Sequence, residues 1–323
     1  MKNLRLGVFL HKLFFLCGII YLGGCASAPT WQNKTENIYS PPKTILPLKI
    51  IGEESLGSAR LNSPQGLVID PSGNLYIVDS GNNRIVKCDS AGNFLQEVGG
   101  FGWDDGELNS PGYVAMDNGL SLYVSDTQNK RVERFDNHLN FIQSISTFDQ
   151  ETPFERSQLN GIALSLSGEL YISDSENDCI WKLDPQFTSI EKIGGFESGA
   201  GAFNDPQGIT IDAQGNLYVT DTGNGRIVVF DLFGNYAAQI GGEELNIPYG
   251  VEIGRDGIVY VANTYGDNLA AFDQDGRLLF KFGTTGTRMG EFSKPKDLKI
   301  FQDDKIYIVD SGNNRIQILA LIR

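Results

Sequence analysis

The chain has 323 residues, with 26 Lys and Arg against 40 Asp and Glu, so its formal net charge at pH 7 is −14. This acidic balance opposes binding to nucleic acid or to anionic lipid, because phosphate contacts need clusters of basic side chains. Only two histidines are present, which excludes a metal site built mainly from imidazole ligands.

Residues 1–24 have the pattern of an export signal. Lys2 and Arg5 precede an apolar stretch from Val8 to Ile20, which is short for a membrane span. The stretch leads into Leu22-Gly23-Gly24-Cys25, which resembles the lipobox of bacterial lipoproteins. An ordinary secretory signal or a membrane helix is the alternative interpretation.

The resemblance to lipoproteins implies that Cys25 becomes a lipidated N-terminus, on which several acyl chains give stable anchoring. Residues 25–44 contain Pro29, Pro41 and Pro42 among polar residues, and we expect them to form a lipidated flexible tether. Ala26 follows the cysteine, which by family analogy favours the outer membrane. We therefore expect an exported protein that is lipid-anchored to the bacterial membrane and faces either the periplasm or the exterior.

The charge and the cysteines of the mature chain fit export. The signal contains three basic residues, Lys2, Arg5 and Lys12, and no acidic one, so 23 basic residues remain against 40 acidic ones, a net charge of −17. No nucleic-acid partner is expected for such a chain. Cys88 takes a position that is Phe in other repeats and is expected to be a small core residue. Cys179 lies two repeats away, so neither a disulfide between the two nor a metal site is expected.

One segment of the chain recurs six times. Residues 75–85, LYIVDSGNNRI, return almost unchanged at residues 306–316, and four weaker copies lie between them. The copies are anchored on Asp79, Asp126, Asp174, Asp221, Asn263 and Asp310, at steps of 47, 48, 47, 42 and 47 residues. A period in the forties predicts a repeat array whose core lies between neighbouring units.

Each unit is expected to be a four-stranded antiparallel meander. In the copy from Pro206 to Gly242, four short β-branched runs are separated by turns rich in Gly, Asn and Asp. Such a unit is typical of a propeller blade, so the sequence predicts an all-β, six-bladed β-propeller over residues 45–323. The last repeat has room for three strands only. The run 46–52 resembles the fourth strand of the first repeat, and we expect this N-terminal strand to pair with the C-terminal repeat and close the ring.

The repeated run Tyr-[Ile/Val]-x-Asp-[Ser/Thr]-x-Asn-x-Arg-[Ile/Val], with an upstream Pro-x-Gly, resembles the NHL repeat, whose arrays fold as six-bladed propellers. The resemblance covers roughly residues 45–323 and is strong in repeats 1, 2, 4 and 6. The third repeat departs from it at Cys179, where Arg is expected. The fifth departs at Asn263, Gly266 and Asn268, where Asp, Asn and Arg are expected.

The Asp, Asn and Arg of the motif bracket a tight turn, where carboxylate, amide and guanidinium can bond one another and the turn backbone. A group that is repeated in most blades is expected to be a structural turn clamp rather than a catalytic site. The clamp residues are Asp79, Asn82, Arg84, Asp126, Asn129, Arg131, Asp221, Asn224, Arg226, Asp310, Asn313 and Arg315.

The positions at which one repeat differs from the others are the candidates for ligand binding, because the fold does not require them. The residue expected just before each innermost strand is Gln65, Gly112, Asn160, Gln207, Tyr249 or Lys296. The next position is glycine in four repeats but Tyr113 and Asp297 in the other two. We expect Gln65, Tyr113, Asn160, Gln207, Tyr249, Lys296 and Asp297 to line an axial mouth that binds a peptide or a sugar; an ordinary polar rim is the alternative.

Two further features stand out from the repeat. Glu252 and Lys299 occupy equivalent innermost positions in adjacent repeats and are expected to form an interblade ion pair. The blade-to-blade segments near Trp103 and over residues 148–155 mix aromatic and acidic residues. Trp103 lies in a routine connector, where we expect it to pack against the protein; binding of a partner is the alternative.

The sequence favours a non-catalytic binding or scaffold propeller of the cell envelope, expected to be monomeric, whose partner is a protein, peptide or glycan. The alternative is a metal-dependent hydrolase or lyase, because lactonases and the peptide α-amidating lyases have similar propellers. The mature chain has a single histidine, His138, on the side opposite the expected mouth, and only Glu252 and Asp297 offer carboxylates at innermost positions. No catalytic residue, metal or cofactor is therefore expected, although calcium held by acidic and backbone oxygens stays open.

Overall fold

The computed structural model describes residues 41–146, 156–195, 199–302 and 304–323. The expected signal, nearly all of the expected tether and the whole aromatic and acidic segment at 148–155 lie outside these residues. In the described part of the chain, no helix is long and apolar enough to cross a membrane. The description below concerns the compact unit Asn37–Arg323.

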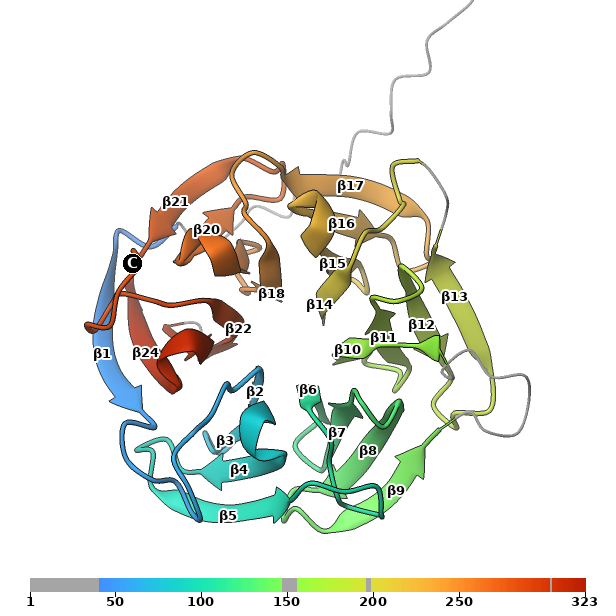
Figure 1. Cartoon of the computed structure of the whole chain (residues 1–323). Coiled ribbons are helices and arrows are strands. Elements are labelled where there is room, and N and C mark those ends of the chain that lie inside the picture. Colours follow the sequence, from blue (N-terminus) through green and yellow to red (C-terminus); the bar gives the residue numbers. More distant parts are fainter. Residues whose placement is uncertain (1–40, 147–155, 196–198, 303) are drawn as a thin grey trace, which may run out of the picture. The chain divides into compact units, whose positions relative to one another are not determined.

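Six four-stranded antiparallel sheets are arranged as a ring, as the sequence predicted (Figure 1). Blade 1 comprises β2 (Gly66–Ile69), β3 (Leu75–Asp79), β4 (Arg84–Cys88) and β5 (Phe94–Gly99). Blade 2 comprises β6 (Pro111–Asp117), β7 (Ser121–Asp126), β8 (Arg131–Asp136) and β9 (Phe141–Ile145). Blade 3 comprises β10 (Leu159–Leu164), β11 (Leu170–Asp174), β12 (Cys179–Leu183) and β13 (Ile190–Gly194).

The other three blades have the same strand order, and each blade has its first strand nearest the axis. Blade 4 comprises β14 (Pro206–Ile211), β15 (Leu217–Asp221), β16 (Arg226–Phe230) and β17 (Tyr236–Gly241). Blade 5 comprises β18 (Pro248–Ile253), β19 (Val259–Asn263), β20 (Asn268–Phe272) and β21 (Leu278–Phe282). Blade 6 comprises β22 (Pro295–Phe301), β23 (Lys305–Asp310), β24 (Arg315–Ile322) and β1 (Thr44–Ile51).

Strand β1 closes the ring. It pairs antiparallel with β24, from Thr44 opposite Ile322 to Ile51 opposite Ile316, and so supplies the fourth strand of blade 6 (Figure 1). The strand begins at Thr44, one residue before the expected start of the propeller. Its residues Ile45 and Ile51 are buried in the cores on the two sides of blade 6.

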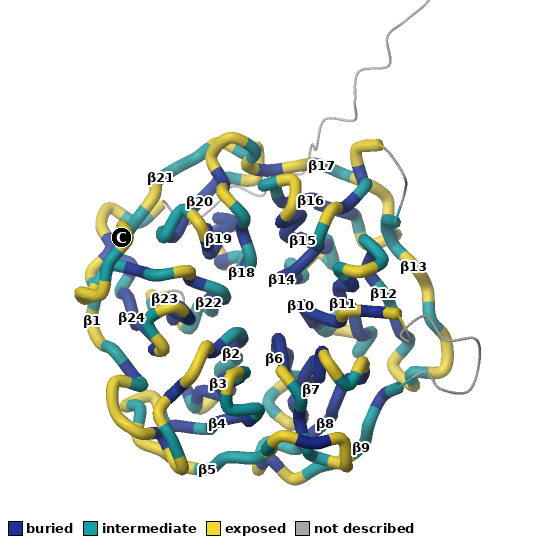
Figure 2. Tube along the Cα trace, in the orientation of Figure 1, coloured by how far each residue is buried: buried dark blue, intermediate teal, exposed yellow. Residues whose placement is uncertain are grey.

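The core lies between blades, because each sheet packs both of its faces against its neighbours. The second strands β3, β11, β15 and β19 are buried along their whole length, as is β7 (Figure 2). One cluster joins Tyr76 and Val78 of blade 1 to Leu122 and Phe135 of blade 2. Strand positions in a sheet that is buried on both faces favour β-branched and aromatic residues, and the repeat has such residues there.

The second-to-third-strand turns are short 3-10 helices in four blades: η1 (Ser80–Asn82), η3 (Thr222–Asn224), η4 (Thr264–Gly266) and η5 (Ser311–Asn313). Each is followed by a residue in the left-handed region, with φ between 47° and 63°. Asn83, Asn314 and Gly225 suit that conformation. This residue reverses the chain sharply. In blades 1, 4 and 6 the clamp carboxylate then faces the guanidinium at the start of the next strand, whereas blade 5 has Asn263 and Asn268 at these places.

The inner strands of successive blades approach closely at glycines. A Cβ atom on Gly161 would lie 2.0 Å from the Gln207 carbonyl oxygen, and one on Gly208 would lie 2.2 Å from that of Tyr249. Gly66 and Gly250 are equally restricted by the backbone of the next blade. The glycines that directly follow the candidate mouth residues in four blades are therefore required by the packing of the ring.

Candidate functional site

Six of the seven predicted ligand-binding residues lie in the lining of one depression of about 360 Å³ at one end of the axis. They are Gln65, Tyr113, Asn160, Gln207, Tyr249 and Lys296, and we call this surface the axial mouth. The remaining lining is mainly polar and includes the hydroxyls of Ser63, Ser80, Ser110 and Thr127 and the amides of Gln128 and Gln158.

The mouth residues lie within the inner strands rather than just before them, which corrects the expected position in five blades. In these five blades the mouth residue lies in a register irregularity near the start of its strand, between Pro111 and Val114 in β6 and between Pro206 and Ile209 in β14, for example. Gln65 lies just before β2, whose pairing with β3 is regular. An irregularity of this kind places an extra residue in one strand and changes the direction of its side chains. Residues from five inner strands are thereby able to line a common depression.

Two amides at the mouth are fixed by the protein itself. The Asn160 amide nitrogen donates to the Gln158 carbonyl, at 3.2 Å, and to the Ser175 hydroxyl, at 2.8 Å. The Gln207 amide nitrogen donates to Asp205 Oδ1 at 2.6 Å. Both side chains are therefore held in place by their nitrogens, and among the described residues no side chain or backbone N–H donates to their Oδ1 and Oε1 atoms.

Lys296 contributes the one ammonium group in the lining of the mouth. Its Nζ lies 3.0 Å from the centroid of the Tyr249 ring, and no carboxylate in the described parts of the chain is within ion-pair distance of it. Burial lowers the pKa of Lys296 to about 7, against the opposing effect of Asp205 and with a smaller contribution from Lys294. A weakly solvated cation without a counter-charge costs stability.

Tyr113 brings a second unsatisfied group to the mouth. Its side chain is buried, and its hydroxyl has no hydrogen-bond partner among the described residues. Burial raises the pKa of Tyr113 well above its usual value, and Asp297, Tyr249 and Asp205 add to the effect. A buried hydroxyl usually finds a partner, so its isolation here is an exception.

Asp297 is not among the residues that line the mouth. It is buried, and its two oxygens accept hydrogen bonds from the backbone N–H groups of Leu67, at 3.0 Å, and Leu298, at 2.8 Å. The carboxylate thus ties blade 6 to blade 1. Burial raises the pKa of Asp297 to about 6, although the nearby Lys299 ammonium and these two N–H groups lower it.

Glu252 and Lys299 form an ion pair between the inner strands of blades 5 and 6. Lys299 Nζ lies 2.9 Å from Glu252 Oε2, and each side chain is about one-fifth exposed, at 21%. Burial alone would lower the pKa of Lys299, but the Glu252 and Asp297 carboxylates outweigh it and raise that pKa. Because both axial carboxylates have partners, this pair and Asp297 act as ties between blades.

The turn clamps have the geometry expected of scaffold. The Arg Nε to Asp Oδ2 distance is 2.7 Å at Arg84, 2.9 Å at Arg131, and 2.7 Å at Arg226 and Arg315. In each case the Asn of the motif also donates to the same oxygen. The other carboxylate oxygen accepts the backbone N–H of Asn62, Asn109, Asn204 or Ser293, at 2.7 Å each. The clamp therefore fixes the incoming connector as well as the turn.

The two irregular blades replace the missing arginine differently. In blade 3 the Trp181 indole donates to Asp174 Oδ2 at 2.8 Å, and the Ser157 hydroxyl donates to it at 2.6 Å. In blade 5 a neutral pair, Asn263 and Asn268, occupies the same place. The role of Trp181 was missed from the sequence. It follows Cys179 by two positions, where Gln317 follows Arg315 and likewise donates to its clamp carboxylate.

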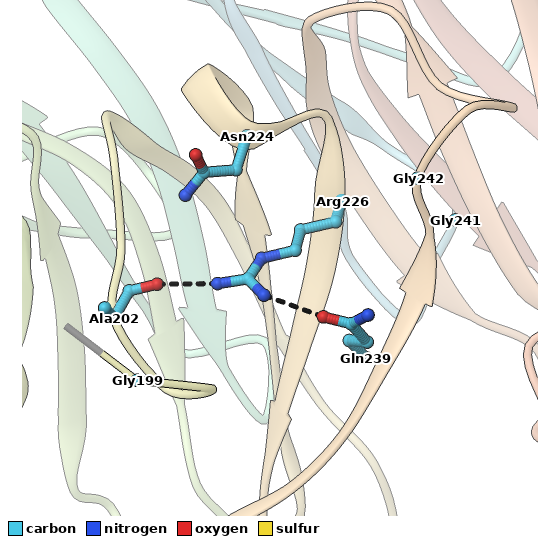
Figure 3. Close-up of a pocket in the computed structure, with 7 residues that line it drawn as sticks. All are labelled: Gly199, Ala202, Asn224, Arg226, Gln239, Gly241 and Gly242. Carbon is cyan, nitrogen blue, oxygen red and sulfur yellow. Dashed lines mark hydrogen bonds between the residues drawn. The ribbon is translucent and has the colours of Figure 1, made fainter.

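A second depression, of about 400 Å³, lies at the rim of blade 4 (Figure 3). Arg226 crosses it and donates to the Ala202 carbonyl at 2.8 Å and to Gln239 Oε1 at 2.7 Å. The same guanidinium is paired with Asp221. Its donors are therefore engaged by the protein, and this depression is the solvent side of a turn clamp.

The connector from blade 1 to blade 2 exposes two aromatic rings. Phe101 is 61% exposed and Trp103 is 65% exposed, and the rings contact each other edge to face with centroids 5.0 Å apart. The expectation that Trp103 packs into the protein was wrong for its ring. Its backbone is engaged at both groups: the N–H donates to Glu107 Oε2 at 3.1 Å, and the carbonyl accepts from Arg131 at 2.8 Å.

Comparison with known proteins agrees with this architecture. The sequence model of the NHL repeat matches residues 61–88, 203–230 and 292–319, which lie in blades 1, 4 and 6. The match covers fewer repeats than the resemblance expected from the sequence, which was strong in repeats 1, 2, 4 and 6. Blade 2 is not matched, although it carries a complete clamp; its turn reads Thr127-Gln128-Asn129-Lys130, without the glycine of the matched repeats. No curated protein matches the chain as a whole.

Several solved structures share the fold at low sequence identity. Virginiamycin B lyase from Staphylococcus aureus is 13% identical, with a TM-score of 0.61 over 86% of this chain and 99% of that one. An auxiliary nutrient binding protein from Bacteroides thetaiotaomicron is 13% identical, with a TM-score of 0.65 over 87% and 77%. A gluconolactonase from Xanthomonas campestris is 16% identical, with a TM-score of 0.63 over 87% and 99%. The protein is a six-bladed β-propeller with NHL repeats, and its structural neighbours include both binding proteins and enzymes.

The effect of Lys296 on the free energy of unfolding can be measured. At pH 7 we expect Lys296→Met to raise the free energy of unfolding by ~1–3 kcal/mol, after allowance for its partial exposure, because the folded state lowers the pKa of this lysine. The unfolded chain binds more protons between the folded value of about 7 and the ordinary value of 10.5, so wild-type stability rises with pH across that window. The advantage of methionine should therefore shrink as pH rises from 7 to 10.5.

Urea unfolding at several pH values tests this expectation, with Lys43→Met, a change at an exposed lysine on the opposite face, as the matched control. A Lys296→Met protein that is less stable than the wild type at pH 7 would show that the ammonium has a stabilising partner.

Proposed function

We propose that the protein is a non-catalytic binding propeller of the bacterial cell envelope, anchored to the membrane through Cys25, and that the axial mouth binds a protein, peptide or glycan. The observation that carries this proposal is that six side chains outside the repeated motif line one depression. The repeat does not require these residues, and two of them, Tyr113 and Lys296, are left without polar partners among the described residues.

The arrangement of the axial carboxylates supports binding over metal-dependent catalysis. Glu252 is paired with Lys299, and Asp297 accepts two backbone N–H groups. In the described ranges, no three His, Cys, Asp or Glu side chains gather as a metal-ligating group. A hydrolase or lyase of the kind found among the structural neighbours would have to break these ties to free its ligands, and no observation on this chain favours that.

The described chain enters the propeller on the face opposite the mouth. Ile51 pairs with Ile316, close to the turn η5 on the mouth side, whereas Thr44 pairs with Ile322 at the other end of the blade. The Lys43 backbone N–H also donates to the Ile322 carbonyl, at 2.7 Å. A tether that ends at residue 43 therefore joins the propeller at the face opposite the mouth.

Capture of partners from envelope extracts tests the proposal. The bait is the full chain purified in detergent, as wild type or as the triple variant Gln65→Ala, Tyr249→Ala and Lys296→Met. We expect the mouth variant to lose at least about 90% of a specifically captured partner, because it removes three polar side chains that line the site. The control carries Leu166→Ala, Leu232→Ala and Phe233→Ala, which change exposed residues in turns on the opposite face.

The control variant should capture as much partner as the wild type. If the mouth variant, folded by circular dichroism, captures the same partners in the same amounts, the binding site is elsewhere and the proposal is wrong.

A further inference from the structure

The chemistry of the axial mouth restricts what it can bind. Its only ammonium group, Lys296, contacts the Tyr249 ring and no carboxylate of the described chain. The nearby Asp205 accepts the Gln207 amide through Oδ1. A cation that is largely removed from water without an internal counter-charge is a site for an anionic group of a ligand.

Two further groups at the mouth lack partners. The Tyr113 hydroxyl is buried without a hydrogen bond, and the Gln65 side-chain amide bonds to no described residue. Asn160 and Gln207 have their nitrogens engaged and their oxygens directed to no described donor. The mouth therefore combines one cation with a free amide and two amide oxygens, which can donate to and accept from ligand hydroxyls.

The lining favours a saccharide over a peptide. Apart from glycines, the apolar contribution to the lining is Pro111 and the two tyrosine rings. A peptide is usually held by apolar pockets for its side chains or by pairing along a strand edge. Sugar hydroxyls act as both donors and acceptors, which the amides and hydroxyls of this mouth match, and a ring such as that of Tyr249 offers an apolar body with a polar tip.

We propose that the axial mouth binds an acidic saccharide, whose carboxylate pairs with Lys296 and whose hydroxyls bond Gln65, Asn160 and Gln207. This inference rests on the proposed function of the same site and names its ligand class. It requires no chemical change in the ligand, and so no leaving group or co-reactant.

Binding should depend on pH in a defined direction. The ionisable groups that face Lys296 are Tyr249, Asp205 and Lys294, and Asp297 lies near Tyr113. The free lysine has a pKa of about 7, and a bound carboxylate raises it, so binding takes up a proton above pH 7. Affinity is then expected to fall by about tenfold per pH unit from about pH 7.5 to pH 9. Asp297, with a pKa of about 6, is already ionised in that window and does not reverse the trend.

Calorimetric titration of the full chain in detergent tests the inference. The probes are uronic-acid and sialic-acid oligosaccharides, the same sugars as carboxyl methyl esters, and acidic tripeptides. We expect an acidic saccharide to bind at least about tenfold more tightly than its ester, a difference of ~1.4 kcal/mol. Lys296→Met should remove this preference for the acid. Lys296→Arg should keep the preference and lose the pH dependence, because a guanidinium does not titrate in this range.

The inference is overturned if no acidic saccharide binds, if acid and ester bind the wild type equally, or if an acidic tripeptide binds more tightly than every saccharide. If one of these titration results is obtained and the mouth variant still loses its partner in the capture experiment, the proposed function stands and the ligand is of another class. Unchanged capture in the mouth variant would remove the proposed function itself.

Discussion

Deletion of residues 1–51, which removes β1, is expected to destabilise the propeller by at least ~5 kcal/mol. The strand buries Ile45 and Ile51, at ~1.5–3 kcal/mol each, and its pairing with β24 adds hydrogen bonds worth ~0.5–1.5 kcal/mol each. Its loss also leaves β24 as an unpaired edge. Since domains are typically stable by about 5–15 kcal/mol, the shortened protein should lose its cooperative unfolding transition or aggregate.

Deletion of residues 1–40 is the matched control for this experiment, because it keeps all of β1. Urea and thermal unfolding followed by circular dichroism compare the two proteins with the full chain. If the protein lacking residues 1–51 unfolds cooperatively with the same midpoint as the control, β1 does not hold the ring closed.

Substitution of a clamp carboxylate is expected to have the second largest effect. Asp310 is fully buried and accepts hydrogen bonds from Arg315, Asn313 and Gln317, as well as from the Ser293 backbone. Asp310→Ala leaves the buried Arg315 guanidinium without its carboxylate. We expect a loss of ~3–5 kcal/mol in the free energy of unfolding, the usual cost of an unpaired buried charge.

Blade 5 supplies the control for this substitution within the same molecule. Asn263 stands at the clamp position but interacts only with the neutral Asn268 side chain and the Asn246 backbone N–H. Asn263→Ala should cost only ~1–2 kcal/mol, because it removes neutral hydrogen bonds. Equal effects of the two substitutions on the urea midpoint would mean that the ion pairs add nothing beyond their hydrogen bonds.

Many of the aspartates of the chain belong to structural turns. Besides the clamps, Asp70, Asp212 and Asp231 each accept backbone N–H groups within their own turns, as do other turn aspartates. At Asp184 the hydroxyl and backbone N–H of Thr188 lower the carboxyl pKa to about 2. Such carboxylates stay ionised at neutral pH and belong to the scaffold, so the net charge says little about the ligand.

The fold could be predicted from the sequence because every level of it repeats. The strand runs, the turns and the clamp triads recur at a nearly constant step, so an error in one copy is corrected by the other five. The closing role of β1 followed from counting strands in the last repeat. The local chemistry of Asp79, Asn82 and Arg84 also follows from spacing alone, since all three bracket one short turn.

The candidate site could be predicted only in part. Aligning the repeats located the positions around the axis, but two consecutive positions in blade 6 have different surroundings. Lys296 lies in the register irregularity and lines the mouth, whereas Asp297 lies in the regular ladder opposite Val309 and bonds to blade 1. Side-chain direction at such an irregularity depends on the neighbouring blade, which sequence alternation does not contain.

Contacts between distant segments account for the other differences between the sequence predictions and the structure. Trp181 replaces the arginine of blade 3 because an indole N–H reaches the same carboxylate oxygen from two residues further along the strand. Trp103 was expected to pack against the protein because its connector resembles those of other repeats. The connector is instead held through its backbone, and the Trp103 ring lies in solvent. Neither outcome follows from local residue preference.

The measurement that tests the account most directly is the comparison of envelope capture by the mouth variant and the opposite-face variant. If the axial mouth is the binding site, Gln65→Ala, Tyr249→Ala and Lys296→Met together abolish capture of a partner that the wild type and the Leu166, Leu232 and Phe233 variant retain. Loss of capture in the opposite-face variant, with full capture by the mouth variant, would contradict the account.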